Sequence, residues 1–262
     1  MCIRDRITLK QQTELSGIDI KENEIYISFL GGERISSKLI IGADGINSTL
    51  RKKAKIKTRT WSYDQRAFVA GLKTEKFHEY TAWQLFTPTG PIALLPFDLM
   101  KGSNISLVWS AEIDYAEKLQ KLTQKEFVKE LEEKTEQILG KIDLKTDIRS
   151  FPLNQLHAKS YFSERIALVG DSAHSFHPLA GQGLNIGLSD VTSLSAVLIK
   201  ARRSGLDIGS KRTLKDYERS RKIPNLTMAA MMELFKEGFE TSDPWVKSVS
   251  YTHLTLPTIL RV

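Results

Sequence analysis

The sequence predicts a mixed α/β (α+β) fold in which an antiparallel sheet interrupts an α/β unit. Short apolar runs near residue 40 and near residue 167 each end in a loop that contains glycine and aspartate. Each loop leads into a helical pattern, as in α/β units with a parallel sheet. Between them, several short apolar runs separated by turn signals indicate an antiparallel sheet.

Length and composition limit the class of protein and the number of domains. The 262 residues are 41% hydrophobic and 26% charged, which is typical of a globular chain with one large domain or two small ones. Cys2 is the only cysteine, which excludes an internal disulfide and a cysteine metal site. No unbroken apolar run approaches the roughly 18–20 residues that span a bilayer, and no signal peptide is visible.

Strands are predicted over residues 7–41. Apolar and polar residues alternate over 25–29, and the glycine pair at 31–32 marks a tight turn. The run at 39–41 is apolar throughout, as in a strand that is buried on both faces. A short helix is expected over 46–55.

The middle of the chain is predicted to form the antiparallel sheet, followed by a helix. The helical pattern runs from Thr123 to Leu139, and Thr123 with Glu126 has the form of a capping box. The four predicted strands are Ala67–Leu72, Ala82–Phe86, Ile92–Leu95 and Ile105–Trp109.

The last third returns to an α/β pattern. A buried strand is predicted at 166–169, a helix at 183–201, and a second helical stretch at 212–240 in which Pro224 marks a kink or break. Five residues keep helical spacing on one face of the first helix: Leu184, Leu188, Val191, Leu194 and Leu198.

The loop between that strand and helix predicts a ligand site. Asp171 comes at the carboxyl end of the strand, where open α/β sheets bind ligands, and a carboxylate can accept hydrogen bonds from two ligand hydroxyls. Gly181 and Gly183 allow a ligand to approach the backbone closely. The helix then directs free N–H groups at an anionic ring or phosphate. Any one of these residues alone would indicate only a helix cap or a turn, whereas their combination indicates a ligand site.

A metal site is the alternative for the same loop. Asp171, His174 and His177 are spaced three residues apart, and such a trio can ligate zinc or iron. The intervening loop is not expected to be one regular helix, and no fourth ligand is evident. We therefore assign the two histidines to packing of the loop and predict no metal.

Two motifs resemble those of class A FAD-dependent aromatic hydroxylases. The segment from Val169 to Asp190 is similar to their Gly-Asp motif and, from His177 onward, to the signature of the ubiquinone-biosynthesis branch. Gly42–Arg51 resembles their Asp-Gly motif. Gln84–Pro96 is similar to their substrate-domain sheet, although Leu85 stands where a basic residue is expected. The resemblance covers residues 7–248.

The resemblance implies a partial Rossmann-like FAD-binding domain with an inserted antiparallel β-sheet substrate domain, of the p-hydroxybenzoate hydroxylase type. Residues 7–60 and 156–248 would form the FAD-binding domain, and 61–155 the substrate domain. Residues 1–6 and 249–262 resemble translated sequencing adapters and are expected to be non-native.

One departure from the family pattern concerns its opening unit. The Gly-x-Gly-x-x-Gly motif that holds the FAD pyrophosphate is absent. The chain is therefore expected to be a fragment that is inactive by itself, holds FAD poorly and has low stability with an exposed sheet edge.

The function implied is a flavin-dependent monooxygenase that uses NAD(P)H and O2 to hydroxylate a polyprenyl phenol precursor of ubiquinone. Asp171 would bind ribityl or ribose hydroxyls, Pro178 would line the face where oxygen reacts, and Asp44 and Arg51 would help to hold phosphates. No catalytic residue is singled out. Trp83, Phe86 and Leu95 would line the substrate cavity or simply pack the core. The implied cofactor-binding residues are Asp44, Gly45, Ser48, Arg51, Gly170, Asp171, Pro178, Gly181, Gln182, Gly183, Leu184 and Asn185.

Location and partners follow from that substrate. A cytoplasmic protein is expected, peripheral on the inner membrane or within a biosynthetic complex. The net charge of +7 includes a basic cluster at 51–59, which would face either phosphate groups or solvent. No nucleic-acid-binding motif is present. The alternatives are another flavoprotein of the same fold (a reductase, epoxidase or halogenase) and a non-catalytic binding or scaffold subunit.

Overall fold

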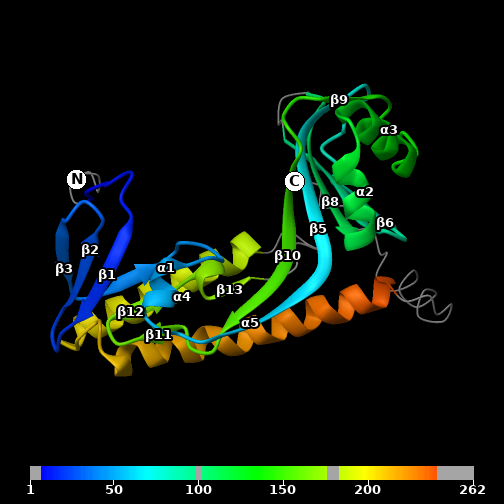
Figure 1. Cartoon of the computed structure of the whole chain (residues 1–262). Coiled ribbons are helices and arrows are strands. Elements are labelled where there is room, and N and C mark those ends of the chain that lie inside the picture. Colours follow the sequence, from blue (N-terminus) through cyan, green and yellow to red (C-terminus); the bar gives the residue numbers. More distant parts are fainter. Residues whose placement is uncertain (1–6, 98–101, 176–182, 241–262) are drawn as a thin grey trace. The chain divides into compact units, whose positions relative to one another are not determined.

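The structure is a computed structural model that describes residues 7–97, 102–175 and 183–240 (Figure 1). The chain divides into two compact units. The first unit is Met1–Trp61 with Gln155–Ala229, and the second is Ser62–Asn154 with Ala230–Val262. Two strands, β5 (Thr58–Thr74) and β10 (Arg149–Ala158), run through the boundaries between them.

A three-stranded antiparallel sheet opens the first unit, in the region where strands were predicted. It consists of β1 (Leu15–Ile20), β2 (Ile25–Phe29) and β3 (Arg34–Ser37), in that order. Gly32, in the turn after β2, has φ +83°, a left-handed conformation that glycine adopts without strain.

A second three-stranded sheet forms the core of the first unit. Strand β4 (Ile40–Gly42) pairs in parallel with β12 (Ile166–Leu168), and β11 (Phe162–Ser163) pairs antiparallel with β12. All three residues of β12 are fully buried, as predicted for this strand. Among the described strands, β4 has no neighbour on its other side, so the expected exposed edge lies at β4.

Three helices belong largely to this unit. They are α1 (Thr49–Lys53), α4 (Gly183–Arg203) and α5 (Lys211–Glu240), the long helix of Figure 1. Pro224 lies inside α5, which continues through it, so of the predicted kink or break the break does not occur. A short 3-10 turn, η2 (Gly170–Ser172), and the strand β13 (His174–Ser175) follow β12.

The predicted face of α4 is confirmed at Leu194, which is buried, and at Leu198, which packs against the same core, but not in the first half of the helix. Leu184, Leu188 and Val191 are 72%, 55% and 47% exposed. The buried residues are Ile186, Asp190, Leu194 and Ala201. The spacing of apolar residues predicted the wrong face for the first half of α4 because the buried face there contains Asp190. The basic side chains of His174 and Arg221 contact this aspartate.

In the part of the chain that the structure describes, one helix, α4, is long and apolar enough to cross a membrane by length and composition alone, and 22% of its most apolar stretch is buried. The sequence shows no unbroken apolar run here because polar residues interrupt the helix. A single such helix is weak support for a membrane span.

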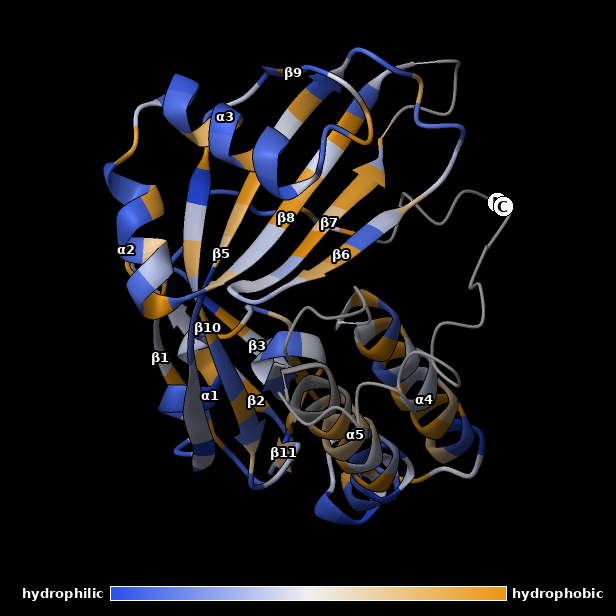
Figure 2. Ribbon diagram, turned by 90° about the vertical axis from the view of Figure 1, so that its right-hand side faces the viewer, coloured by the Kyte–Doolittle hydropathy of each residue, from blue (hydrophilic) through white to orange (hydrophobic). Residues whose placement is uncertain are grey.

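The antiparallel sheet of the second unit confirms the predicted strand region. Its strands are β5, β6 (Trp83–Thr87), β7 (Gly90–Pro96), β8 (Asn104–Glu112) and β10, and β13 joins its edge, in the order β13-β10-β5-β8-β7-β6. Strand β9 (Ile142–Leu144) pairs with the end of β5. Hydrophobic residues occupy much of β5, β7 and β8 (Figure 2).

One face of this sheet packs against α2 (Ile113–Lys121) and α3 (Gln124–Lys134). The core between them includes Leu94 and Trp109 from the sheet and Phe127 from α3, all at most 1% exposed. The predicted capping box of α3 is present: Thr123 and Glu126 each accept a hydrogen bond from the other's backbone N–H.

The sheet register places the three residues that were expected to line a substrate cavity. Trp83 pairs with the buried Leu94 and packs against the core, which favours the core-packing interpretation for this residue. Phe86 and Leu95 lie one residue out of phase, on the opposite face, and are 47% and 38% exposed.

Candidate functional site

Parallel pairing of β4 with β12 brings two predicted loops to one edge of the sheet. Gly42 pairs with Leu168, so the chain leaves both strands at the same end. We call residues 43–48 the Asp-Gly loop and residues 170–172 the Gly-Asp turn. Ligands of α/β folds bind at this end of the strands.

Asp44 organises the Asp-Gly loop. Its carboxylate accepts hydrogen bonds from the Ser48 hydroxyl and, at 3.0 Å, from the Leu50 N–H. Burial raises the pKa of Asp44, but these hydrogen bonds outweigh burial and hold the pKa below its ordinary value. Ser48 caps α1 by accepting from the Arg51 N–H at 3.0 Å. Asp44 and Ser48 therefore shape the loop, and Gly45, at φ +77°, lies in its turn.

Arg51 ties the two loops together. Its side chain is only 4% exposed and donates to the Ser172 carbonyl at 2.7 Å and to the Ile46 carbonyl at 2.5 Å. A guanidinium can hold two carbonyls in this way because its donors form a rigid fork. Arg51 is thus directed into the protein, which differs from the expected contact with a cofactor phosphate.

The backbone of the Gly-Asp turn is fixed on both sides. The Gly170 N–H donates to Asp190 Oδ2 at 3.0 Å, and the Ser172 hydroxyl donates to the Gly42 and Val169 carbonyls at 2.5 and 2.8 Å. Gly170 has φ +58°, a conformation that favours glycine. The exposed Asp171 is different: among the described residues, no hydrogen bond or ion pair engages its carboxylate. A rigid turn therefore presents one acidic side chain to solvent.

The start of α4 lies against this turn. A Cβ built on Gly187 would come within 3.4 Å of the Gly170 Cα, closer than most real contacts of this kind. Gly187 thus packs against the Gly-Asp turn. Gly183, Leu184 and Asn185 form the exposed first turn of α4. Three further predicted cofactor residues, Pro178, Gly181 and Gln182, lie outside the described residues, as does His177.

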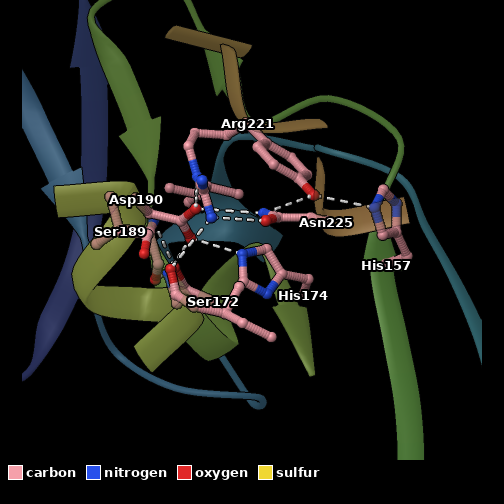
Figure 3. A network of polar contacts seen from close by, with 12 residues as sticks. His157, Ser172, His174, Ser189, Asp190, Arg221 and Asn225 are labelled. Atoms are coloured by element: carbon pink, nitrogen blue, oxygen red, sulfur yellow. Dashed lines mark hydrogen bonds and ion pairs between the residues drawn. The ribbon is translucent and has the colours of Figure 1, made fainter. Parts of the chain in front are cut away.

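Asp190 is a site residue to which the sequence assigned no role. It is fully buried and contacts His174 Nε2 at 2.6 Å, Arg221 Nε at 2.7 Å and Asn225 Nδ2 at 3.2 Å (Figure 3). Burial raises the pKa of Asp190, but the hydrogen bonds from His174 and Arg221 hold it below its ordinary value. The sequence offered one signal for a buried role of Asp190: it lies one helical turn after the apolar Ile186 on a mostly apolar helix.

The network extends to a second histidine. Asn225 Nδ2 lies 3.3 Å from the Tyr161 hydroxyl, which lies 2.9 Å from His157 Nε2. Burial lowers the pKa of His157, and the positive charges of His174 and Lys222 add to this effect. His174 thus packs within the loop region as expected. Among the described residues, no group of three histidine, cysteine or acidic side chains is arranged to hold a metal.

A cavity of about 840 Å³ lies in the second unit. Its walls come from β5, β8 and the segment that joins β9 to β10, and they mix apolar and polar side chains. Thr146 closes one side by accepting a hydrogen bond from the Gly71 N–H at 2.8 Å. The lining includes Val69, Phe97, Leu144, Asn104, Ser106 and Arg149.

The residues at the Gly-Asp turn fit a flavin nucleotide. The exposed Asp171 carboxylate suits the adjacent hydroxyls of a ribityl or ribose chain, because each oxygen can accept a hydrogen bond. The N–H groups of the first turn of α4 suit negative charge. The close contact between Gly170 and Gly187 lets the first turn of α4 lie against the Gly-Asp turn.

Known proteins share both sequence and fold with this chain. It is 36% identical over 253 residues to "Ubiquinone biosynthesis monooxygenase COQ6, mitochondrial" of Danio rerio, covering 83% of the chain and 51% of the relative. It is 36% identical over 240 residues to "3-demethoxyubiquinol 3-hydroxylase" of Escherichia coli, covering 91% and 60%. The chain thus spans between half and two thirds of the length of these relatives.

Solved structures support the fold. The p-nitrophenol 4-monooxygenase PnpA of Pseudomonas putida superimposes with a TM-score of 0.73 at 18% identity, covering 92% of this chain and 60% of that one. The flavin-dependent halogenase CmlS also reaches 0.73 at 17% identity, covering 93% and 46%. At such low identity these similarities are evidence for a shared fold only.

The family follows from a match over most of the chain. Residues 7–229 match the model described as "FAD binding domain", a range that includes both loops at the sheet edge, Asp190 and the second unit up to Asn154. With the mixed α/β fold and the inserted antiparallel sheet, this match shows that the chain belongs to the family of FAD-binding monooxygenases.

Proposed function

We propose that this chain forms part of a flavin-dependent monooxygenase that hydroxylates the aromatic ring of a polyprenyl phenol precursor of ubiquinone, with NAD(P)H and O2. The observation that carries the proposal is the exposed Asp171 on a rigid turn at the carboxyl edge of the parallel strands. The printed names of the relatives, a ubiquinone-biosynthesis monooxygenase and a 3-demethoxyubiquinol 3-hydroxylase, support the substrate class.

FAD, when bound and reduced by NAD(P)H, supplies the reaction with O2 that delivers one oxygen atom to an electron-rich ring. The residues of this chain bind and orient. Asp171 accepts hydrogen bonds from cofactor hydroxyls, and Arg51 and Asp190 keep its turn in place. The first turn of α4 directs N–H groups toward negative charge, where fixed dipoles are most effective.

The second unit is proposed to hold the substrate. Its cavity combines apolar walls at Val69, Phe97 and Leu144 with hydrogen-bonding groups at Asn104 and Ser106. An apolar prenyl chain gains roughly 25 cal/mol for each Å² that it buries, whereas a phenol hydroxyl needs a polar partner. Such a substrate partitions into lipid, so we also propose a cytoplasmic enzyme that is peripheral on the inner membrane or attached to a biosynthetic complex.

The first experiment measures FAD affinity by flavin fluorescence for the chain and for Asp171→Ala. Loss of two hydrogen bonds to a charged acceptor should raise Kd about 10- to 100-fold. Asp216→Ala removes an exposed carboxylate of the same unit and should leave Kd unchanged. Equal Kd values for the chain and Asp171→Ala would contradict the assignment.

Product analysis then separates the alternatives. Because the chain is expected to be inactive by itself, this experiment uses the complete protein, and incubation with FAD, NAD(P)H, O2 and a short prenylated phenol should give the hydroxylated phenol. Oxidation of NAD(P)H without a hydroxylated product would favour a reductase, and an epoxide or halide would favour those reactions. A folded protein without affinity for FAD would favour the scaffold alternative.

A further inference from the structure

We propose that Asp190 is a positioning residue that sets the orientation of Asp171 and thereby the affinity for the hydroxyl-bearing chain of the cofactor. The inference deepens the proposed function and rests on Asp171 as the cofactor ligand. Asp190 does not contact the ligand itself, because its side chain is fully buried. It acts through the backbone of the Gly-Asp turn.

The link is the 3.0 Å hydrogen bond from the Gly170 N–H to Asp190 Oδ2. Gly170 is the residue directly before Asp171, so its peptide group sets the direction in which the Asp171 side chain leaves the backbone. On the other side, the Ser172 carbonyl accepts from Arg51 at 2.7 Å. The turn is thus held at one residue before Asp171 and at one residue after it.

The surroundings of Asp190 require an ionised carboxylate. Donors face both of its oxygens: Gly170 N–H and His174 on Oδ2, and Arg221 Nε and Asn225 Nδ2 on Oδ1. Arg221 remains charged at all ordinary pH values and compensates the buried negative charge. An acceptor on both sides is needed, which a carboxylate provides and an amide does not.

This requirement makes Asp190→Asn an informative variant. Its amide has one oxygen and one NH2 group, so an NH2 group must face donors on one side of the site. With the oxygen toward Arg221 and Asn225, the NH2 group lies against the Gly170 N–H and the anchor of the turn is lost. Asparagine has nearly the same volume as aspartate and keeps the helix, so the substitution mainly alters the hydrogen bonds of residue 190.

The test compares two flavins, riboflavin and lumiflavin, of which only riboflavin carries the ribityl hydroxyls. Asp190→Asn should raise the Kd of riboflavin about tenfold and leave the Kd of lumiflavin unchanged. In the Asp171→Asn background the same substitution should have almost no further effect, because the group through which it acts is gone. Equal losses for both flavins, or equal losses in both backgrounds, would overturn the proposal.

A second readout does not depend on flavin binding. Amide hydrogen exchange should accelerate at Gly170 in Asp190→Asn, because that N–H loses its acceptor. Thr213→Val is the matched control: Thr213 is buried in the same unit, and its hydroxyl donates to the Asp207 carbonyl at 2.9 Å. The control should lower the melting temperature while exchange at Gly170 stays slow. Unchanged exchange at Gly170 in Asp190→Asn would exclude the proposed link.

The two readouts separate failure of the inference from failure of the proposed function. If neither this chain nor the complete protein binds either flavin, the proposed function fails, and the exchange measurement still decides whether Asp190 anchors the turn. If riboflavin binds, and Asp171→Asn raises its Kd but Asp190→Asn does not, the proposed function is supported and the positioning role of Asp190 is wrong.

Discussion

At the scale of single residues, the site is built by charged side chains that bind the protein's own backbone. Arg51 and Asp190 are both nearly inaccessible, and both contact the Gly-Asp turn. Buried ionised groups are tolerated when hydrogen bonds and opposite charges replace the lost water. Their effect is to leave Asp171 as the exposed member of a fixed turn.

Arg51→Met should lower the free energy of unfolding by about 2–4 kcal/mol, because the substitution leaves the Ser172 and Ile46 carbonyls without their donor. Arg51→Lys should recover only part of this, since one ammonium group cannot reproduce the guanidinium fork. Urea denaturation gives the values. Lys52→Met, at the exposed neighbouring position, should change stability by less than about 0.5 kcal/mol. Equal effects at both positions would contradict the bridging role of Arg51.

At the scale of elements, the sequence predicted those caps and turns that interactions between neighbouring residues stabilise. The cap at Thr123 and the turn at Gly32 each depend on neighbouring residues, and both were found. Strand β12 was found from its unbroken apolar run, although its pairing partner β4 is far away in sequence. Helix α2 has no side-chain cap and was missed, and so was β10, whose residues are interrupted by Pro152. These two elements depend on tertiary contacts that a sequence pattern does not display.

The capping box of α3 gives a test at this scale. Thr123→Ala removes the hydroxyl that accepts from the Glu126 N–H at 3.3 Å, which should lower stability by about 1 kcal/mol. Thr123→Ser retains the hydroxyl and should stay close to wild type. Thermal or urea unfolding followed by circular dichroism measures both variants. An alanine variant as stable as the serine variant would show that the cap contributes nothing.

At the scale of the whole molecule, the site joins segments that are far apart in sequence. Asp171 could be predicted because its strand, glycines and helix are contiguous. The network of Asp190 could not, because Arg221 and Asn225 come from α5 and His174 from the segment after the turn. Only the fold brings these groups together, and no spacing in the sequence encodes their contacts.

That buried network should give the whole molecule a characteristic dependence on pH. Burial, with the charges of His174 and Lys222, lowers the pKa of His157 in the folded protein. The unfolded chain takes up this proton near pH 6.5 and the folded chain only at lower pH, so stability falls as pH drops below about 6.5. Asp44 and Asp190 have lowered pKa values, so their contributions are lost only in more acid solution, below about pH 4.

Melting temperatures measured from pH 8 to pH 3 should therefore fall in two separate ranges. His157→Gln keeps a hydrogen-bonding partner for the Tyr161 hydroxyl but cannot titrate, so it should reduce the fall between about pH 7 and pH 5 and leave the acid fall unchanged. The difference between the two curves reports His157 together with its electrostatic coupling to His174. Parallel curves across the upper range would mean that His157 takes up its proton as readily in the folded protein as in the unfolded chain.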